Sequence, residues 1–110
     1  MLGIKEIVYE KNGESLIINI SDNCKISYKY ISRVVDNELI FKYLEHLFRI
    51  IDDWRKEYVD TRIIDGRIWK LSINYVNGNK KEYRGKGTYP NNFEAFERLN
   101  QKLIIEVQNG

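Results

Sequence analysis

Cysteine, proline, histidine and alanine each occur only once in this chain of 110 residues, and long apolar runs are absent. With Cys24 as its single cysteine, the chain cannot form an internal disulfide, so its fold does not depend on an oxidising compartment. No apolar run approaches the roughly 20 residues that a membrane-spanning helix needs. Glu6 interrupts the start where a signal peptide would need an apolar stretch, so we expect a cytoplasmic protein with no membrane association.

An excess of charge of one sign is also missing. The 18 basic and 16 acidic residues leave a net charge of +2, which excludes a charged disordered tail and is too mild to indicate nucleic-acid binding. Hydrophobic residues make up 43% of the chain, enough for one packed core, so we expect a single domain over residues 1–110. Sixteen Ile, 11 Lys and 11 Asn against one Ala suggest an AT-rich bacterial or phage genome.

Alternating apolar residues predict strands in the first half. Ile7 and Tyr9, then Leu16 and Ile18, lie two apart, the period of half-buried strands. Asn12-Gly13 between them is a strong hairpin signal, because a type I′ turn needs positive φ at both central residues. This turn pairs Tyr9 with Leu16 and Ile7 with Ile18, so the large apolar side chains share one face.

The next turn is predicted from register. A three-residue loop at 21–23 sets Ile18 opposite Ile26 and Leu16 opposite Tyr28, whereas a two-residue loop would mix the two faces. Asn23 would then take the left-handed backbone conformation, which Asn tolerates better than most residues.

Strands are predicted in the second half by the same reasoning. A strand from Trp69 to Tyr75 is followed by a three-residue loop at 76–78, which brings Tyr83 opposite Leu71. A turn at Asp65-Gly66 would place an earlier strand beside it, with Val59 opposite Leu71 and Thr61 opposite Trp69. The strand 80–86, with its many charges and Gly85, is predicted to be a protected edge.

Two helices complete the pattern. The first is expected from Leu39 to about Lys56, with Asp36 as N-cap and a buried stripe of Ile40, Tyr43, Leu44, Leu47, Ile51 and Trp54. The second is expected from Asn91, where Asn91 and Glu94 resemble a capping box after Pro90, with a stripe of Phe96, Leu99, Leu103 and Val107.

A shift of 55 residues superposes the two halves, with nine identities and both three-residue loops aligned. Two explanations of this similarity stay open. The chain contains a β-β-β-α repeat over 4–56 and 58–107, or two amphipathic patterns match by chance. In both cases the expected fold is α+β in the order βββα-βββα, an antiparallel sheet with two helices packed on one face.

One set of motifs resembles a known pattern: Asp65-Gly66-Arg67-Ile68-Trp69, then Asn77-Gly78, Tyr83, Gly85 and Tyr89-Pro90-Asn91-Asn92-Phe93. It is similar, over residues 60–103, to small proteins of bacteria and mobile elements with the form D-G-x-x-W, G, Y-P-x-N-F. Gly87 and Thr88 depart from that pattern. The resemblance implies a fold and no activity, and the residues themselves are typical of scaffold positions: turn glycines, a core tryptophan and a proline-led helix start.

Candidates for catalysis are few. His46 lies off the apolar stripe without a positioned partner, which gives neither a general base nor a metal site. Cys24 is expected to be a small buried residue rather than a nucleophile. Asp52 and Asp53 are adjacent on a predicted helix and so point in different directions, which excludes a paired-carboxylate site. Asp60 and Asp65 could be brought together only by details of the fold that the sequence does not predict. Gly85-Lys86-Gly87 lacks the spacing of a phosphate-binding loop. We therefore expect no enzyme, metal or cofactor.

A charged sheet face is the better candidate site. The predicted register turns six basic residues away from the helices: Lys25, Lys29, Arg62, Lys70, Lys80 and Arg84. Glu6, Glu10 and Glu82 share that face, and only Val8 and Ile17 interrupt its polarity. The face could bind an acidic protein or a nucleic-acid backbone, or it could simply be solvated.

These observations favour a small non-catalytic protein that binds another macromolecule, above all a protein. An inhibitor or immunity-type protein, such as a phage or mobile-element antagonist of a bacterial defence nuclease, fits the size and the lack of a catalytic site. A nucleic-acid-binding module is the alternative, although the face lacks aromatic stacking platforms. A small enzyme or ligand binder is the third class.

Overall fold

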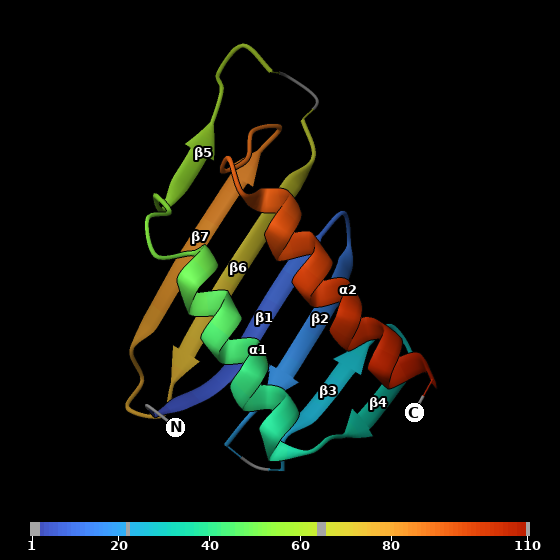
Figure 1. Ribbon diagram of the computed structural model, residues 1–110. Coiled ribbons are helices and arrows are strands. Elements are labelled where there is room, and N and C mark those ends of the chain that lie inside the picture. Colours follow the sequence, from blue (N-terminus) through green and yellow to red (C-terminus); the bar gives the residue numbers. More distant parts are fainter. Residues whose placement is uncertain (1–2, 22, 64–65, 110) are drawn as a thin grey trace.

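The computed structural model describes residues 3–21, 23–63 and 66–109, which form a mostly antiparallel seven-stranded sheet and two helices (Figure 1). The elements in chain order are β1 (Ile4–Lys11), β2 (Glu14–Asn19), β3 (Lys25–Tyr28), β4 (Ile31–Val34), α1 (Asn37–Ile50), β5 (Glu57–Val59), β6 (Ile68–Tyr75), β7 (Lys80–Lys86) and α2 (Phe93–Asn109). The strand order across the sheet is β4-β3-β2-β1-β6-β7-β5. The α+β class is therefore confirmed. No helix in these ranges is long and apolar enough to cross a membrane.

The first hairpin has the predicted register. Ile7 pairs with Ile18 and Tyr9 with Leu16, and all four side chains are buried. Asn12 and Gly13 both have positive φ, at 53° and 82°, as a type I′ turn requires. Local turn chemistry and the apolar alternation therefore specify the same pairing.

The β2–β3 register is also confirmed, with Ile18 opposite Ile26, but the left-handed residue is not Asn23. Cys24 takes that conformation, with φ of 52°. Its thiol donates to Asn37 Oδ1 at 2.8 Å, and its carbonyl accepts from the Val35 N–H at 2.9 Å. These two hydrogen bonds hold Cys24 in the left-handed conformation. Asp22, in the same loop, lies outside the described residues.

The second half departs from prediction at β5. Leu71 pairs with Tyr83 as expected, but Val59 does not face Leu71 and Thr61 does not face Trp69. β1 occupies that edge of β6, so β5 pairs in parallel with β7 instead, and the strand 80–86 is not an edge. The Asp65-Gly66 turn predicted there includes Asp65, which lies outside the described residues.

The glycine at position 85 is explained by its contact with Trp69 rather than by a position on an edge strand. The two residues are paired across β6 and β7, and a Cβ at position 85 would collide with the indole nitrogen of Trp69. That nitrogen donates to the carbonyl of Thr88 at 3.0 Å, so the ring is held flat against the strand. A glycine is required because the indole occupies the space of a side chain.

The strand β4 was not predicted. The residues Lys29 and Tyr30 form a tight turn after β3, with Lys29 at φ of 54°, and the chain returns alongside it. All four residues of β4 are exposed, and the strand forms one edge of the sheet.

The helix α1 has the predicted N-cap, but it begins at Asn37 rather than at Leu39 and ends earlier than predicted. The Asp36 carboxylate accepts from the N–H of Glu38 at 3.2 Å, which confirms the N-cap. The helix stops at Ile50 rather than near Lys56, and the chain then turns so that Trp54 enters the core. All six residues of the predicted apolar stripe are buried.

The start of α2 differs from the predicted capping box. The helix begins at Phe93, and Asn92 rather than Asn91 occupies the junction. Asn92 Oδ1 accepts from the Trp54 indole at 2.7 Å, and its Nδ2 donates to the carbonyl of Ile50 at 2.8 Å. This one side chain therefore ties the end of α1 to the start of α2.

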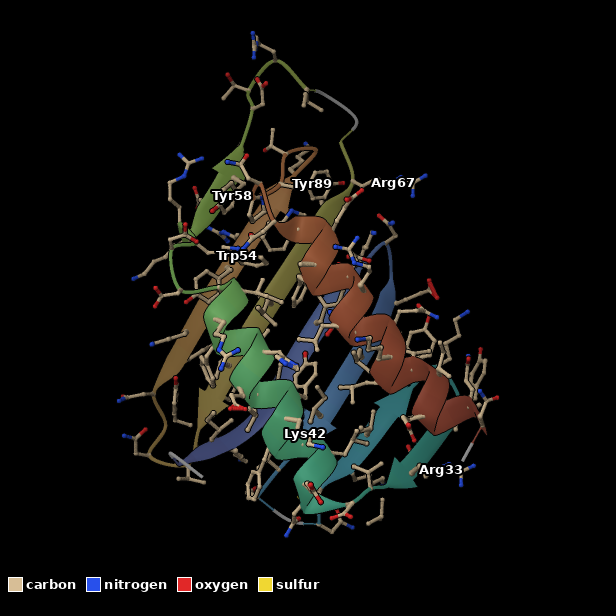
Figure 2. The ribbon with its side chains drawn as sticks, in the orientation of Figure 1. Arg33, Lys42, Trp54, Tyr58, Arg67 and Tyr89 are labelled. Carbon is tan, nitrogen blue, oxygen red and sulfur yellow. The ribbon has the colours of Figure 1, made fainter. Side chains whose placement is uncertain are left out.

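An aromatic cluster forms the centre of the core. The ring centroids of Trp54 and Trp69 lie 5.7 Å apart, and those of Tyr9 and Phe96 lie 4.7 Å apart. Figure 1 shows α1 and α2 crossing in front of the sheet, and Figure 2 shows Trp54, Tyr58 and Tyr89 gathered where α1 ends and α2 begins. The 55-residue repeat remains a prediction, since β4 and the parallel pairing of β5 have no counterpart in the other half.

We expect Asn92→Ala to lower the free energy of unfolding by about 2–3 kcal/mol, because it leaves the buried Trp54 N–H without an acceptor. The neighbouring variant Asn91→Ala is the control, and its exposed site predicts a change within about 0.5 kcal/mol. Chemical denaturation of both variants measures the difference. Equal losses would show that the Asn92 bridge does not stabilise the helix junction.

Candidate interaction surfaces

The outer sheet face is defined here by the side chains that alternate with the buried core residues along the strands. Four of the six predicted basic residues lie on it: Lys25, Lys70, Lys80 and Arg84. Arg84 is opposite Lys70 in the register, and Lys80 is opposite Asn74. The predicted face therefore exists in part, and its cations come mainly from β6 and β7.

Carboxylates of the sheet already pair with these cations. Glu82 Oε2 lies 3.0 Å from Lys80 Nζ and 3.4 Å from Lys70 Nζ. The hydrogen bond from Lys80, assisted by Lys70, holds the pKa of Glu82 below its usual value despite partial burial. Arg84 Nη2 lies 2.7 Å from Glu57 Oε2 on the neighbouring β5, and this contact raises the pKa of Arg84. Much of the positive charge is thus balanced within the face.

The remaining two predicted residues lie elsewhere. Lys29 is in the β3–β4 turn, with its Nζ 3.2 Å from Glu14 Oε2 and 5.4 Å from the centre of the Tyr28 ring. Arg62 is in the turn after β5, where its guanidinium donates twice to Asp60 at 3.0 and 2.8 Å. The placement of Arg62 on the sheet face was wrong because β5 pairs with β7 and the chain leaves the sheet before residue 62.

The middle of the outer sheet face is nearly neutral. Val8 and Ile17 pair across β1 and β2, and Ser72, opposite Val8 on β6, is buried. The hydroxyls of Ser27 and Ser32 lie 2.8 Å apart on β3 and β4. Among the described residues, this surface has neither aromatic platforms for bases nor a row of unpaired cations for phosphates.

The catalytic candidates do not converge. His46 is exposed on α1, and Asp52 and Asp53 are exposed beyond its end. Asp60 is held by Arg62, and Asp65 lies outside the described residues. Among residues 3–21, 23–63 and 66–109, no three His, Cys, Asp or Glu side chains gather in a way that could hold a metal ion. Gly87, at φ of 69°, packs against Ile63, which gives that glycine a structural role.

A polar cavity of about 260 Å³ lies between α2 and the β1–β2 hairpin. On its wall the Tyr9 hydroxyl donates to Glu97, and Lys11 Nζ lies 3.4 Å from the same carboxylate. Burial, together with Glu97, raises the pKa of Tyr9, so the phenol stays a proton donor. Asn100 Oδ1 accepts from the Tyr43 hydroxyl at 2.7 Å. Asn100 Nδ2 is buried and has no hydrogen-bond partner among the described residues, whereas the bonds of Tyr9 and Tyr43 join α2 to the sheet and to α1.

A groove runs between α1 and α2. It consists of two hollows of about 370 and 350 Å³ that share three lining residues, His46, Leu99 and Lys102. Sequence reasoning missed this surface because residues near 46 and near 99 belong to separate helices. The only signal was helical spacing: Lys42, His46 and Arg49 share one side of α1, as Arg98 and Lys102 share one side of α2.

The outer edge of β4 is a third surface. In the β3–β4 register the main-chain N–H and C=O groups of Ile31 and Arg33 point toward β3. The N–H of Val35 continues this pattern by donating to the carbonyl of Cys24. Because antiparallel pairing alternates, the N–H and C=O groups of Ser32 and Val34 point outward from the sheet. Arg33 Nε donates to the carbonyl of Val107 at 2.9 Å, which ties this edge to the end of α2 (Figure 2).

No family model matches the chain, and no curated protein or solved structure matches it either. The resemblance to the D-G-x-x-W pattern therefore remains a prediction from the motif residues.

Replacing Glu82 with glutamine tests the ion pairs of the outer sheet face. The pKa of Glu82 is lower in the folded protein than in the unfolded chain, so its stabilisation is present above the unfolded pKa and is lost as the pH falls through the folded pKa. We expect Glu82→Gln to lower the free energy of unfolding by about 0.5–1 kcal/mol at neutral pH and to have no effect in acid.

Denaturant unfolding across this pH range measures the effect. Glu10→Gln is the matched control, since Glu10 lies on the same face and forms no ion pair with a described residue. A Glu82→Gln deficit that is independent of pH, or one equal to that of Glu10→Gln, would contradict the role given to the pair.

Proposed function

We propose that this protein is non-catalytic and acts by binding another protein, as an inhibitor or immunity-type protein such as a phage or mobile-element antagonist of a bacterial defence nuclease. The proposal includes both helices packed on one face of the sheet, with recognition by the free edge strand β4. The observation that carries it is the exposure of this edge, which invites an extended segment of a partner to add as a further strand.

The edge strand is short, but neither a proline nor a bulge blocks it, and apolar side chains lie exposed beside it. Ile31 and Val34 are 39% and 60% exposed, and Tyr30 in the preceding turn is fully exposed. The strand contains no proline and its register to β3 has no bulge. Main-chain groups at Ser32 and Val34 would supply affinity, and the apolar side chains nearby would supply specificity.

Paired charge favours a protein partner over nucleic acid. To bind phosphates, Lys80, Lys70 and Arg84 would have to give up Glu82 and Glu57, which lie 2.7–3.4 Å away. Those carboxylates would also repel the nucleic-acid backbone. The β4 edge carries no such carboxylate and needs no rearrangement to pair.

The test compares two substitutions at one position. Val34→Pro removes the outward N–H and leaves the β3–β4 bonds in place, whereas Val34→Thr keeps the donor and the β-branched shape. We expect tagged wild-type protein and Val34→Thr to retain a stoichiometric protein from a nuclease-treated lysate of the source organism, and Val34→Pro to retain about tenfold less.

Thermal unfolding of both variants shows that the fold is intact before capture. Equal retention by Val34→Pro would exclude recognition by this edge. A parallel capture uses lysate without nuclease treatment. Retention in the untreated lysate alone would identify nucleic acid as the partner and contradict the proposal.

A further inference from the structure

The groove between α1 and α2 has an apolar floor that the packing of the two helices leaves open. Leu39 and Ile50 border it from α1, and Leu99 and Leu103 from α2. Leu39, Ile50 and Leu99 are only half-buried, and Ile105 at the rim is 45% exposed. An apolar strip of this kind, bordered by polar residues, is typical of a site for another apolar side-chain row.

The rim of the groove is predominantly basic. It is formed by Lys42, His46, Arg49, Arg98 and Lys102, and Glu106 is its one acidic member among the lining residues. Lys42 and Arg98 have i,i+4 partners, Glu38 at 3.6 Å and Glu94 at 3.8 Å, which are exposed and therefore weakly bound. His46, Arg49 and Lys102 pair with no carboxylate of the described residues. His46 and Lys102 line both hollows, and Arg49 lines the second of them.

We propose that this groove docks an acidic amphipathic helix of a partner protein. Apolar residues of that helix would fill the floor, and Asp or Glu residues on its flanks would meet the two basic rims. The floor extends from Leu39 to Ile50, which on an α-helix is a span of about 16 Å and matches three turns of an incoming helix. The ligand would therefore carry apolar residues at i, i+3 or i+4, and i+7.

The chemistry of the floor decides between an acidic protein segment and nucleic acid. A phosphate backbone could meet the rim but would leave the half-buried leucines in contact with water or with sugar and phosphate. An acidic amphipathic helix satisfies both parts of the surface at once, and its charge gives a salt-dependent association.

This site is separate from the edge of β4, and the two can be tested independently. β4 presents main-chain groups at the sheet edge, whereas the groove presents side chains of the two helices. A failure of strand addition at β4 would leave the groove proposal standing, and the reverse also holds.

The experiment uses the whole protein with methyl-labelled Ile and Leu, and two designed helical peptides of about 14 residues. Both peptides carry the same leucine row; one has Glu on its flanks and the other has Lys. We expect the acidic peptide to shift the methyl signals of Leu39, Leu99 and Ile105, with an affinity that falls as salt is added, and the basic peptide to leave them unchanged.

Two double variants of equal charge change locate the site. The double variant Arg49→Glu with Lys102→Glu reverses the charge of two rim residues and should weaken binding of the acidic peptide by about tenfold. Lys25→Glu with Lys56→Glu is the matched control, since both of its lysines are exposed and lie outside the groove, and it should leave binding near the wild-type value. Val34→Pro should also bind the peptide normally.

Three results would overturn the proposal: equal binding of the acidic and basic peptides, equal loss in the two double variants, or methyl shifts outside the groove. A short DNA duplex that displaces the peptide and loses affinity in Arg49→Glu with Lys102→Glu would reassign the groove to nucleic acid. A peptide-free protein that light scattering shows to be a dimer, with the groove methyls protected, would assign it to a second copy of the chain.

Discussion

Strand β1 is hydrogen-bonded along both of its edges, to β2 and to β6, and this central position joins the two halves of the chain into one sheet. Its pairing with β6 joins the two halves of the chain through Ile7 opposite Ile73 and Tyr9 opposite Leu71. Because β1 covers one edge of β6 and β7 covers the other, β5 cannot pair with β6, and it lies at the outer edge of β7. The free edges of the sheet are then β5, three residues long, and β4, whose four residues are exposed.

Register within the β1–β2, β2–β3 and β6–β7 hairpins could be predicted because turn length and apolar alternation are local and agree. The order of the strands could not, because the pairing of residues near 7 with residues near 73 leaves no mark in either segment. The strand β4 was missed because its apolar residues do not share a face: Ile31 lies on the side of Tyr28, whereas Val34 lies on the side of Lys25. Such a strand has no period-two pattern to detect.

The same distinction explains the candidate surfaces. Sequence reasoning located four cations on the outer sheet face, but it could not assign Glu57 to Arg84, because that contact depends on the parallel pairing of β5 with β7. The groove between the helices depends on how α1 and α2 pack, which the pattern of each helix leaves open. Side-chain positions that follow from hairpin register were therefore accessible from the sequence, whereas contacts between elements that are not consecutive in the chain were not.

Cys24 gives the molecule a built-in reporter of local opening. The residue is 7% exposed, and its thiol donates to Asn37, the first residue of α1. A thiol-specific reagent can reach this buried sulfur only when its contact with Asn37 opens, so the labelling rate reports the opening of that contact. Since the chain has no other cysteine, one thiol reagent would monitor local opening at this single contact without any engineered substitution.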